Sequence, residues 1–186
     1  MKLRKWISEL MIYDADDESC SDEASEFLQS NKYGGWTVDA VGIRGKDELN
    51  DVLKGYVKIN QITFCTHGFP GGVYFKRGSV TSGNVYSIDV PPDLFGGTGR
   101  LLFMGCETAR SKAGEDFLVD AGRHFFAGKG GVVGGATIYA LGFSSGARLP
   151  LLGSSSAGWH VGKLILFKLD TSGTVTGNSS VSPFGL

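Results

Sequence analysis

The sequence predicts an α/β fold with a mostly parallel central sheet that is flanked by helices. Short apolar segments with strand character alternate with segments whose apolar residues recur at helical spacing. Two apolar segments, residues 62–68 and 101–109, stop abruptly at a histidine and a cysteine that have small neighbours. A length of 186 residues suits one domain with a sizeable core. We therefore expect a single domain over residues 1–186.

The first third of the chain predicts two strand–helix units. Residues 9–14 are typical of a buried strand that ends in an acidic turn, and a helix capped by Ser19 or Ser21 follows. The apolar and polar residues of segment 36–43 alternate, which indicates a second strand. A second helix fits residues 46–56 because its first turn is acidic and its apolar residues form one stripe.

The middle third carries the two segments that end in reactive side chains. Between them, residues 71–75 and 84–88 predict a short hairpin, and residues 91–95 predict a brief helical turn. The strand that leads to Cys106 comes next, and residues 113–127 form an amphipathic pattern typical of a helix.

The last third is rich in glycine and predicts less regular structure. Residues 131–137 are expected to form a fifth strand, residues 143–158 an irregular loop and residues 161–169 a final strand. The tail over residues 171–186 is rich in Ser, Thr and Gly, so we expect it to be loosely held.

The charge of the chain excludes some classes of partner. The formal net charge is -1, which gives no electrostatic reason to expect nucleic acid or an anionic membrane surface as a partner. No apolar run approaches the roughly 20 residues that span a bilayer, and the basic N-terminus is followed by too short an apolar stretch for a secretory signal. We expect a cytoplasmic protein, although export of an effector by a non-classical route is compatible with these features.

The cysteines indicate a reducing compartment. Cys20, Cys65 and Cys106 form no CxxC pair, and their odd number argues against a disulfide framework. The three histidines are widely scattered, so we expect no metal site. Neither of the usual glycine-rich nucleotide motifs is present in its required order, and we expect no cofactor.

His67 and Cys106 predict nucleophilic chemistry. If both segments are parallel strands of one sheet, their carboxyl ends share the edge at which such sheets bind ligands. An imidazole can take the proton of a thiol, and the resulting thiolate attacks carbonyl carbon. The backbone N–H groups of Gly68 and Cys106 are candidate donors to the oxyanion that then develops. Cys65 lies inside its strand and is expected to be structural, while Cys20 is expected to be inert.

Other arrangements of the same residue types lack this strand-end context. Pairing Cys106 with His124 or His160 is one alternative, and pairing Cys20 with His67 is another. His124 lies on the third predicted helix, where a surface or partner-facing role is expected, and His160 is expected to pack or to form a hydrogen bond. Glu107 could orient His67 or cap the following helix, and the sequence favours neither role.

The two segments resemble one known family. Residues 64–68, Phe-Cys-Thr-His-Gly, resemble the strand and His-Gly of caspase-like (clan CD) cysteine peptidases. Residues 105–109, Gly-Cys-Glu-Thr-Ala, with Gly114 beyond them, are similar to the signature of the CHAT-type members. The resemblance covers residues 9–137. It implies a caspase–hemoglobinase-like three-layer sandwich and endopeptidase activity, with His67 and Cys106 as the catalytic dyad.

The chain departs from this family at two points. Many members have Asp two residues before the nucleophile, where this chain has Met104, and no residue matches the basic group that binds aspartate in caspases. The turn after the first strand instead contains Asp14, Asp16 and Asp17. An acidic substrate pocket would favour Arg or Lys at P1, as in the clostripain, gingipain and separase branch. The alternative is a solvated acidic turn at a helix N-terminus.

Three functions follow from these residues. The first is a cysteine endopeptidase that acts on a protein or peptide substrate. The second is a catalytically inactive caspase-like adaptor or regulatory module. The third is an amidohydrolase that uses the same Cys–His pair on a non-protein amide, because the dyad does not select its acyl group. A regulatory partner or a homo-oligomer is compatible with each of them.

Overall fold

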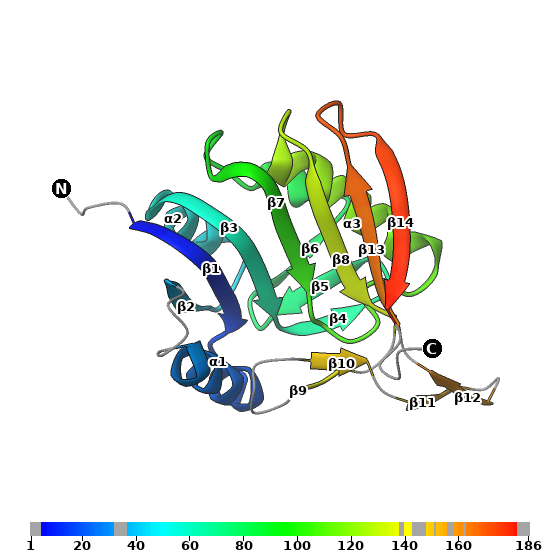
Figure 1. Ribbon diagram of the computed structural model, residues 1–186. Helices are drawn as coiled ribbons and strands as arrows, with labels where there is room; N and C mark the ends of the chain where they lie inside the picture. Colours follow the sequence, from blue (N-terminus) through cyan, green and yellow to red (C-terminus); the bar gives the residue numbers. More distant parts are fainter. Residues whose placement is uncertain are drawn as a thin grey trace.

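A seven-stranded sheet organises the structure, a computed structural model that describes residues 5–31, 37–137, 140–142, 148–150, 152–155, 158–161 and 163–181. The parallel strands are β1 (Lys5–Asp14), β2 (Val38–Ile43), β3 (Tyr56–Cys65), β7 (Phe95–Phe103) and β8 (Gly131–Ala136). The antiparallel strands are β13 (Leu164–Leu169) and β14 (Val175–Val181). The order across the sheet is β2-β1-β3-β7-β8-β13-β14 (Figure 1). The expected α/β fold with a mostly parallel sheet is confirmed.

Helices cover both faces of this sheet. They are α1 (Glu18–Asn31), α2 (Asp47–Lys54) and α3 (Ser111–Phe126), and α2 and α3 lie behind the sheet in Figure 1. Side chains alternate between the two faces of a strand, so Leu10 and Ile12 join the large core with α2 and α3, while Met11 packs under α1. The layers are compatible with a three-layer sandwich.

The remaining elements are small. A three-stranded sheet consists of β4 (His67–Phe69), β5 (Gly72–Phe75) and β6 (Gly78–Thr81), and it is followed by the 3₁₀ turn η1 (Val85–Ser87). Two short hairpins lie between β8 and β13: β9 (Ala140–Gly142) with β10 (Arg148–Pro150), and β11 (Leu152–Ser155) with β12 (Gly158–Val161). The described part of the chain contains no helix that is long and apolar enough to cross a membrane.

Stacked aromatic rings hold the ends of the central strands in place. The rings of Phe64 in β3 and Phe103 in β7 are stacked with centroids 4.9 Å apart. Two rings of α3 pack against this pair: the centroid of Phe125 lies 6.4 Å from that of Phe64, and the centroid of Phe117 lies 4.9 Å from that of Phe103. Both Phe64 and Phe103 are 1% exposed, so this cluster is fully dehydrated. Because the rings lie at the carboxyl ends of β3 and β7, their packing positions the residues that follow both strands.

The second strand of the predicted hairpin lies earlier than expected. Residues 78–81 form β6, whereas residues 85–87 of the expected strand form η1. Asn84 explains the difference, because its side chain accepts a hydrogen bond from the N–H of Thr81 at 2.9 Å and donates one to the carbonyl of Ser79 at 2.9 Å. These contacts fold the chain back on β6, so the strand ends before residue 84.

The C-terminal region is more regular than the sequence predicts. Residues 148–150 and 152–155, expected within an irregular loop, form β10 and β11. Residues 175–181, expected to be loosely held, form β14 at the edge of the main sheet. The carboxylate of Asp170 closes the preceding turn by accepting the N–H groups of Ser172 and Thr174 at 2.8 and 2.9 Å. That turn directs the chain back along β13, where backbone pairing compensates for the polar sequence.

Candidate functional site

The ends of β3 and β7 place the two reactive side chains at one edge of the sheet. The two strands are parallel neighbours, and their last paired residues are Phe64 and Phe103. The N–H of Met104 then donates to the carbonyl of Phe64 at 2.9 Å. His67 and Cys106 each lie three residues beyond the last pair. The expectation that these two strand ends share an edge is therefore confirmed.

The backbones beyond the two strands are in direct contact. A Cβ atom at Gly68 would lie 2.4 Å from the carbonyl oxygen of Cys106 and 2.4 Å from Oγ1 of Thr108. A Cβ atom at Gly105 would lie 2.9 Å from both Cα and N of Gly68. Only glycine allows so close an approach at both positions. The segment that carries His67 is thereby packed onto the turn that carries Cys106.

Cys106 lies in a tight turn between β7 and α3. It is partly exposed, whereas Cys20 and Cys65 are buried. Within the described chain, no acceptor takes its backbone N–H. The buried Thr108 hydroxyl donates to the carbonyl of Gly105 at 3.0 Å and closes the turn around the cysteine. Of the three thiols, only that of Cys106 is therefore available to a substrate.

Glu107, the residue after the cysteine, contacts the helix side of this turn. Its carboxylate accepts a hydrogen bond from the guanidinium of Arg110 at 2.5 Å, and Arg110 directly precedes α3. Its backbone is left-handed, with φ of 59°. Such a conformation is uncommon for a residue other than glycine and is often found at functional turns. The acidic partner of His67 is a different residue.

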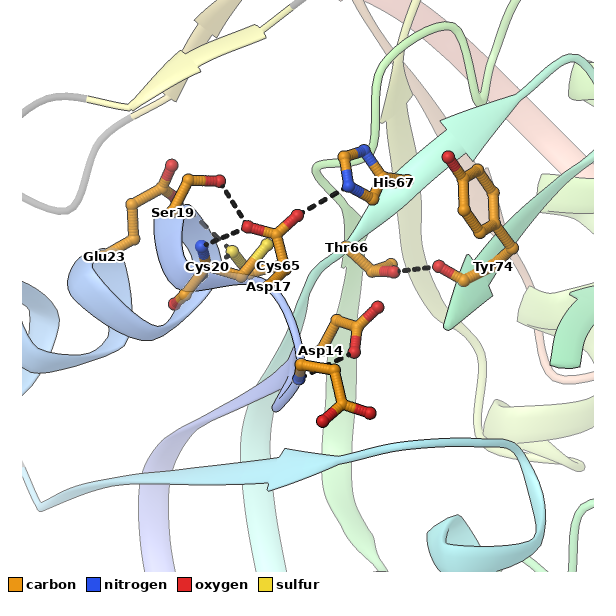
Figure 2. Close-up of polar contacts among 10 residues, drawn as sticks. Asp14, Asp17, Ser19, Cys20, Glu23, Cys65, Thr66, His67 and Tyr74 are labelled. Atoms are coloured by element: carbon orange, nitrogen blue, oxygen red, sulfur yellow. Dashed lines mark hydrogen bonds and ion pairs between the residues drawn. The ribbon is translucent and has the colours of Figure 1, made fainter. Parts of the chain in front are cut away.

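The imidazole of His67 is held on two sides (Figure 2). Its Nε2 lies 2.5 Å from Oδ2 of Asp17. Its ring stacks on the ring of Tyr74, with centroids 5.2 Å apart and planes 16° from parallel. His67 and Tyr74 are direct cross-strand partners of β4 and β5, so both side chains lie on the same face of that small sheet. The histidine side chain remains 52% exposed and accessible.

Asp17 is anchored at the start of α1. Its Oδ1 accepts the hydroxyl of Ser19 at 2.7 Å and the backbone N–H of Cys20 at 3.1 Å. The second contact is a helix N-cap, so Asp17 takes the role that was expected of Ser19 or Ser21. Burial opposes ionisation, but these two hydrogen bonds and the nearby His67 outweigh it and lower the pKa of Asp17 below its ordinary value of 3.8.

Asp17 and His67 lie at the switch point of the sheet. β1 lies between β2 and β3, and the chain leaves β1 towards β2 but leaves β3 towards β7. Open α/β sheets bind their ligands where neighbouring strands connect in opposite directions. Asp17 follows β1 and His67 follows β3, so the topology places both at the carboxyl edge beside this point.

The three acidic residues after β1 have different surroundings. Asp14 is 3% exposed and accepts the N–H of Asp16 at 3.1 Å. The carboxylate of Asp16 lies 3.4 Å from Nε of Arg44. Asp17 contacts His67, as described above. Among the described residues, Asp14 is the member of this group that has neither a cation nor a histidine within salt-bridge distance.

The lowered pKa of Asp17 predicts a pH-dependent contribution to stability. Because the pKa is lower in the folded state, the ionised carboxylate stabilises the fold above its ordinary value of 3.8, and this contribution is lost as the pH falls below that value. Asp17→Asn retains a good N-cap but cannot ionise. We expect wild type to be more stable than Asp17→Asn in urea titrations at pH 7, and this advantage to be smaller in titrations carried out at a pH below 3.8. An unchanged difference between the two pH values would contradict the prediction.

The remaining candidate residues lie away from Asp17 and His67, or their side chains lie outside the described part of the structure. Nε2 of His124 lies 2.6 Å from the carbonyl oxygen of Ile88, and its ring contacts Tyr86, so it packs against the segment after β6. The side chain of His160 lies outside the described residues. Cys20 and Cys65 pack together under α1 in the smaller core cluster. The sequence pattern does not identify Tyr74 as a neighbour of His67, although the hairpin predicted after His67 could have indicated a cross-strand neighbour.

No group of three or more His, Cys, Asp or Glu side chains in the described chain could hold a metal ion. A hollow of about 550 Å³ lies elsewhere, on the face of β7, β8 and β13 that is opposite α3. It is lined by Gln61, Arg100, Leu102, Val132, Leu164, Leu166, Lys168, Gly177, Asn178 and Ser179. This lining contains no histidine, cysteine or acidic side chain.

Comparison with protein-family models gives no match for this chain, and a search of curated proteins gives none either.

Proposed function

We propose that this protein is a cysteine endopeptidase of the caspase-like type, in which His67 and Cys106 form the catalytic dyad. One observation carries the proposal: the backbone after His67 is packed against the backbone of Cys106, with a Cβ at Gly68 only 2.4 Å from the Cys106 carbonyl oxygen. Two neighbouring parallel strands thus bring a histidine and a cysteine to the same edge, which supports their assignment as base and nucleophile.

The chemistry requires a proton to move before the bond to substrate forms. The imidazole of His67 accepts the proton of the Cys106 thiol, and the thiolate attacks the carbonyl carbon of the scissile bond. The N–H of Cys106, together with that of Gly68, donates to the oxyanion of the tetrahedral intermediate. The C–N bond breaks as the imidazolium returns its proton to the leaving amine. Water then hydrolyses the thioester with His67 as base, which restores the thiol.

Asp14 supports a preference for a basic residue at P1. It is buried at the carboxyl end of β1, beside the switch point, and no described cation neutralises it. A buried carboxylate without a cationic partner is costly, so a site of this kind favours an incoming ammonium or guanidinium group. Asp16, which is already paired with Arg44, contributes less negative charge to such a pocket.

An activity-based probe tests both parts of the proposal. We expect a peptidyl acyloxymethyl ketone with Arg or Lys at P1 to alkylate Cys106 and to leave Cys20 and Cys65 unmodified, as mapped by peptide mass spectrometry. The matched probe with Asp at P1 should react more slowly. Pretreatment with iodoacetamide controls for general thiol reactivity.

Three outcomes of this experiment are decisive. Labelling of Cys20 or Cys65 with Cys106 untouched would overturn the assignment of the nucleophile. Faster labelling by the Asp probe would overturn the basic P1 preference while leaving the dyad intact. Failure of every peptide probe, combined with hydrolysis of small amides, would replace the endopeptidase with an amidohydrolase.

A further inference from the structure

We infer that Asp17 is a positioning residue that sets the tautomer and orientation of His67, an inference that rests on the proposed function. Oδ2 of Asp17 lies 2.5 Å from Nε2 of the imidazole. A carboxylate accepts hydrogen bonds and cannot donate them, so Nε2 must carry a proton. In the neutral ring, only Nδ1 is then left to accept the proton of a thiol.

Asp17 is suited to orienting His67 because its other carboxylate oxygen, Oδ1, is already hydrogen-bonded. Oδ1 accepts hydrogen bonds from the Ser19 hydroxyl and the Cys20 N–H, which fix the plane of the carboxylate and direct Oδ2 towards His67 (Figure 2). The Asp17 side chain is only 13% exposed, whereas that of His67 is 52% exposed. A well-fixed acid therefore orients a more accessible base.

The two residues belong to elements that are packed together. Cys20 of α1 and Cys65 of β3 share the buried cluster under α1, and the Cys65 thiol lies 3.9 Å from the carbonyl oxygen of Cys20. Cys20 is three residues after Asp17, and Cys65 is two residues before His67. The contact between acid and imidazole is thus supported by a buried contact directly beneath it, and it does not depend on two freely moving loops.

The same geometry argues against Asp17 as the acid that binds a basic P1 side chain. A guanidinium from a substrate would have to compete with His67 for Oδ2, and its success would release the catalytic base. The groups that face His67 are the Asp17 carboxylate from the turn before α1 and the Tyr74 phenol from β5, with the Cys106 turn packed beyond Gly68. Asp17 is the one acid in direct contact with the imidazole among the described residues.

Two substitutions separate orientation of His67 from capping of α1. Asp17→Asn and Asp17→Ser both preserve an N-cap acceptor, so α1 should stay folded. The Asn amide donates to Nε2, which would shift the ring proton to Nδ1, and the Ser hydroxyl is too short to reach the ring. The matched control is Asp22→Asn, which removes one exposed carboxylate from the same helix.

The first readout is independent of catalysis. ¹⁵N NMR of the imidazole in alkaline solution, where the ring is neutral, reports which nitrogen carries the proton, and His67→Gln identifies the His67 signals. We expect the Nε2–H tautomer in wild type and in Asp22→Asn, its replacement by the Nδ1–H tautomer in Asp17→Asn, and a mixture of the two tautomers in Asp17→Ser. Retention of the wild-type tautomer in both Asp17 variants would overturn the inference.

The second readout is steady-state peptide hydrolysis. We expect Asp17→Asn to lower kcat by about 10²-fold or more, with little change in KM or in P1 preference. A rise in KM for basic substrates at unchanged kcat would instead place Asp17 in the substrate pocket and overturn the positioning role. If wild type hydrolyses no peptide, the proposed function fails, and the NMR result alone decides whether Asp17 sets the tautomer of His67.

Discussion

Replacement of Cys106 by Ala is expected to lower kcat/KM for peptide hydrolysis by about 10³-fold or more. The substitution removes the sulfur that attacks the carbonyl, and no other described thiol can replace it, because Cys20 and Cys65 are buried. Cys106 is partly exposed and Ala occupies less space, so the fold should remain intact. Hydrolysis of a fluorogenic peptide, with thermal unfolding as the check on folding, measures both effects.

A double substitution tests whether His67 and Cys106 act as one unit. If the imidazole serves only to activate this thiol, His67→Ala combined with Cys106→Ala should be no less active than Cys106→Ala alone. Cys20→Ala is the thiol control and should retain most of the activity, because its side chain is buried in the small core cluster and cannot reach a substrate. Full activity in Cys106→Ala would remove the endopeptidase dyad, and a folded but naturally inactive wild type would favour the adaptor function.

Gly68→Ala is expected to have the second largest effect, because it separates the two halves of the site. The added Cβ would lie 2.4 Å from the Cys106 carbonyl oxygen and 2.7 Å from the carbonyl carbon of Gly105. Backbone atoms cannot rotate out of the way as a side chain can. We expect a loss of about 1–3 kcal/mol in the free energy of unfolding. The accompanying displacement of His67 from Cys106 should cost about 10²-fold in kcat/KM.

Two further glycines calibrate this prediction. Gly105→Ala inserts a methyl into the same contact from the opposite side, but its nearest atoms lie at 2.9 Å, so the losses should be smaller. Gly83→Ala is the control, because its Cβ would meet only Oγ1 of Thr81, at an ordinary 3.6 Å. In urea denaturation and peptide hydrolysis, the losses of stability and activity should be largest in Gly68→Ala, smaller in Gly105→Ala and smallest in Gly83→Ala. Wild-type stability and activity in Gly68→Ala would contradict the close packing of the two turns.

Local sequence pattern correctly predicts the helices and strands whose own residues have a clear hydrophobic period. The apolar run before His67 and the amphipathic stripe around Phe117 predict β3 and α3, because burial on one or both faces selects residues with the corresponding period. Predictions were less accurate where single side chains redirect the chain. Asn84 folds back on β6 and Asp170 closes the turn before β14, and neither effect is visible in hydropathy.

The sequence by itself determined that a histidine and a cysteine follow two apolar strands, each beside a glycine. Periodicity and chain order carry that information, because they depend on neighbours along the chain. Only the tertiary structure decided which acid serves the histidine. Asp14, Asp16, Asp17 and Glu107 are chemically alike, and the sequence could assign none of them to the imidazole. The packing of α1 against β3 places Asp17 at Nε2 of His67, while Glu107 pairs with Arg110. A contact between residues that are 50 positions apart (67 less 17) depends on how the layers pack, which no local pattern encodes.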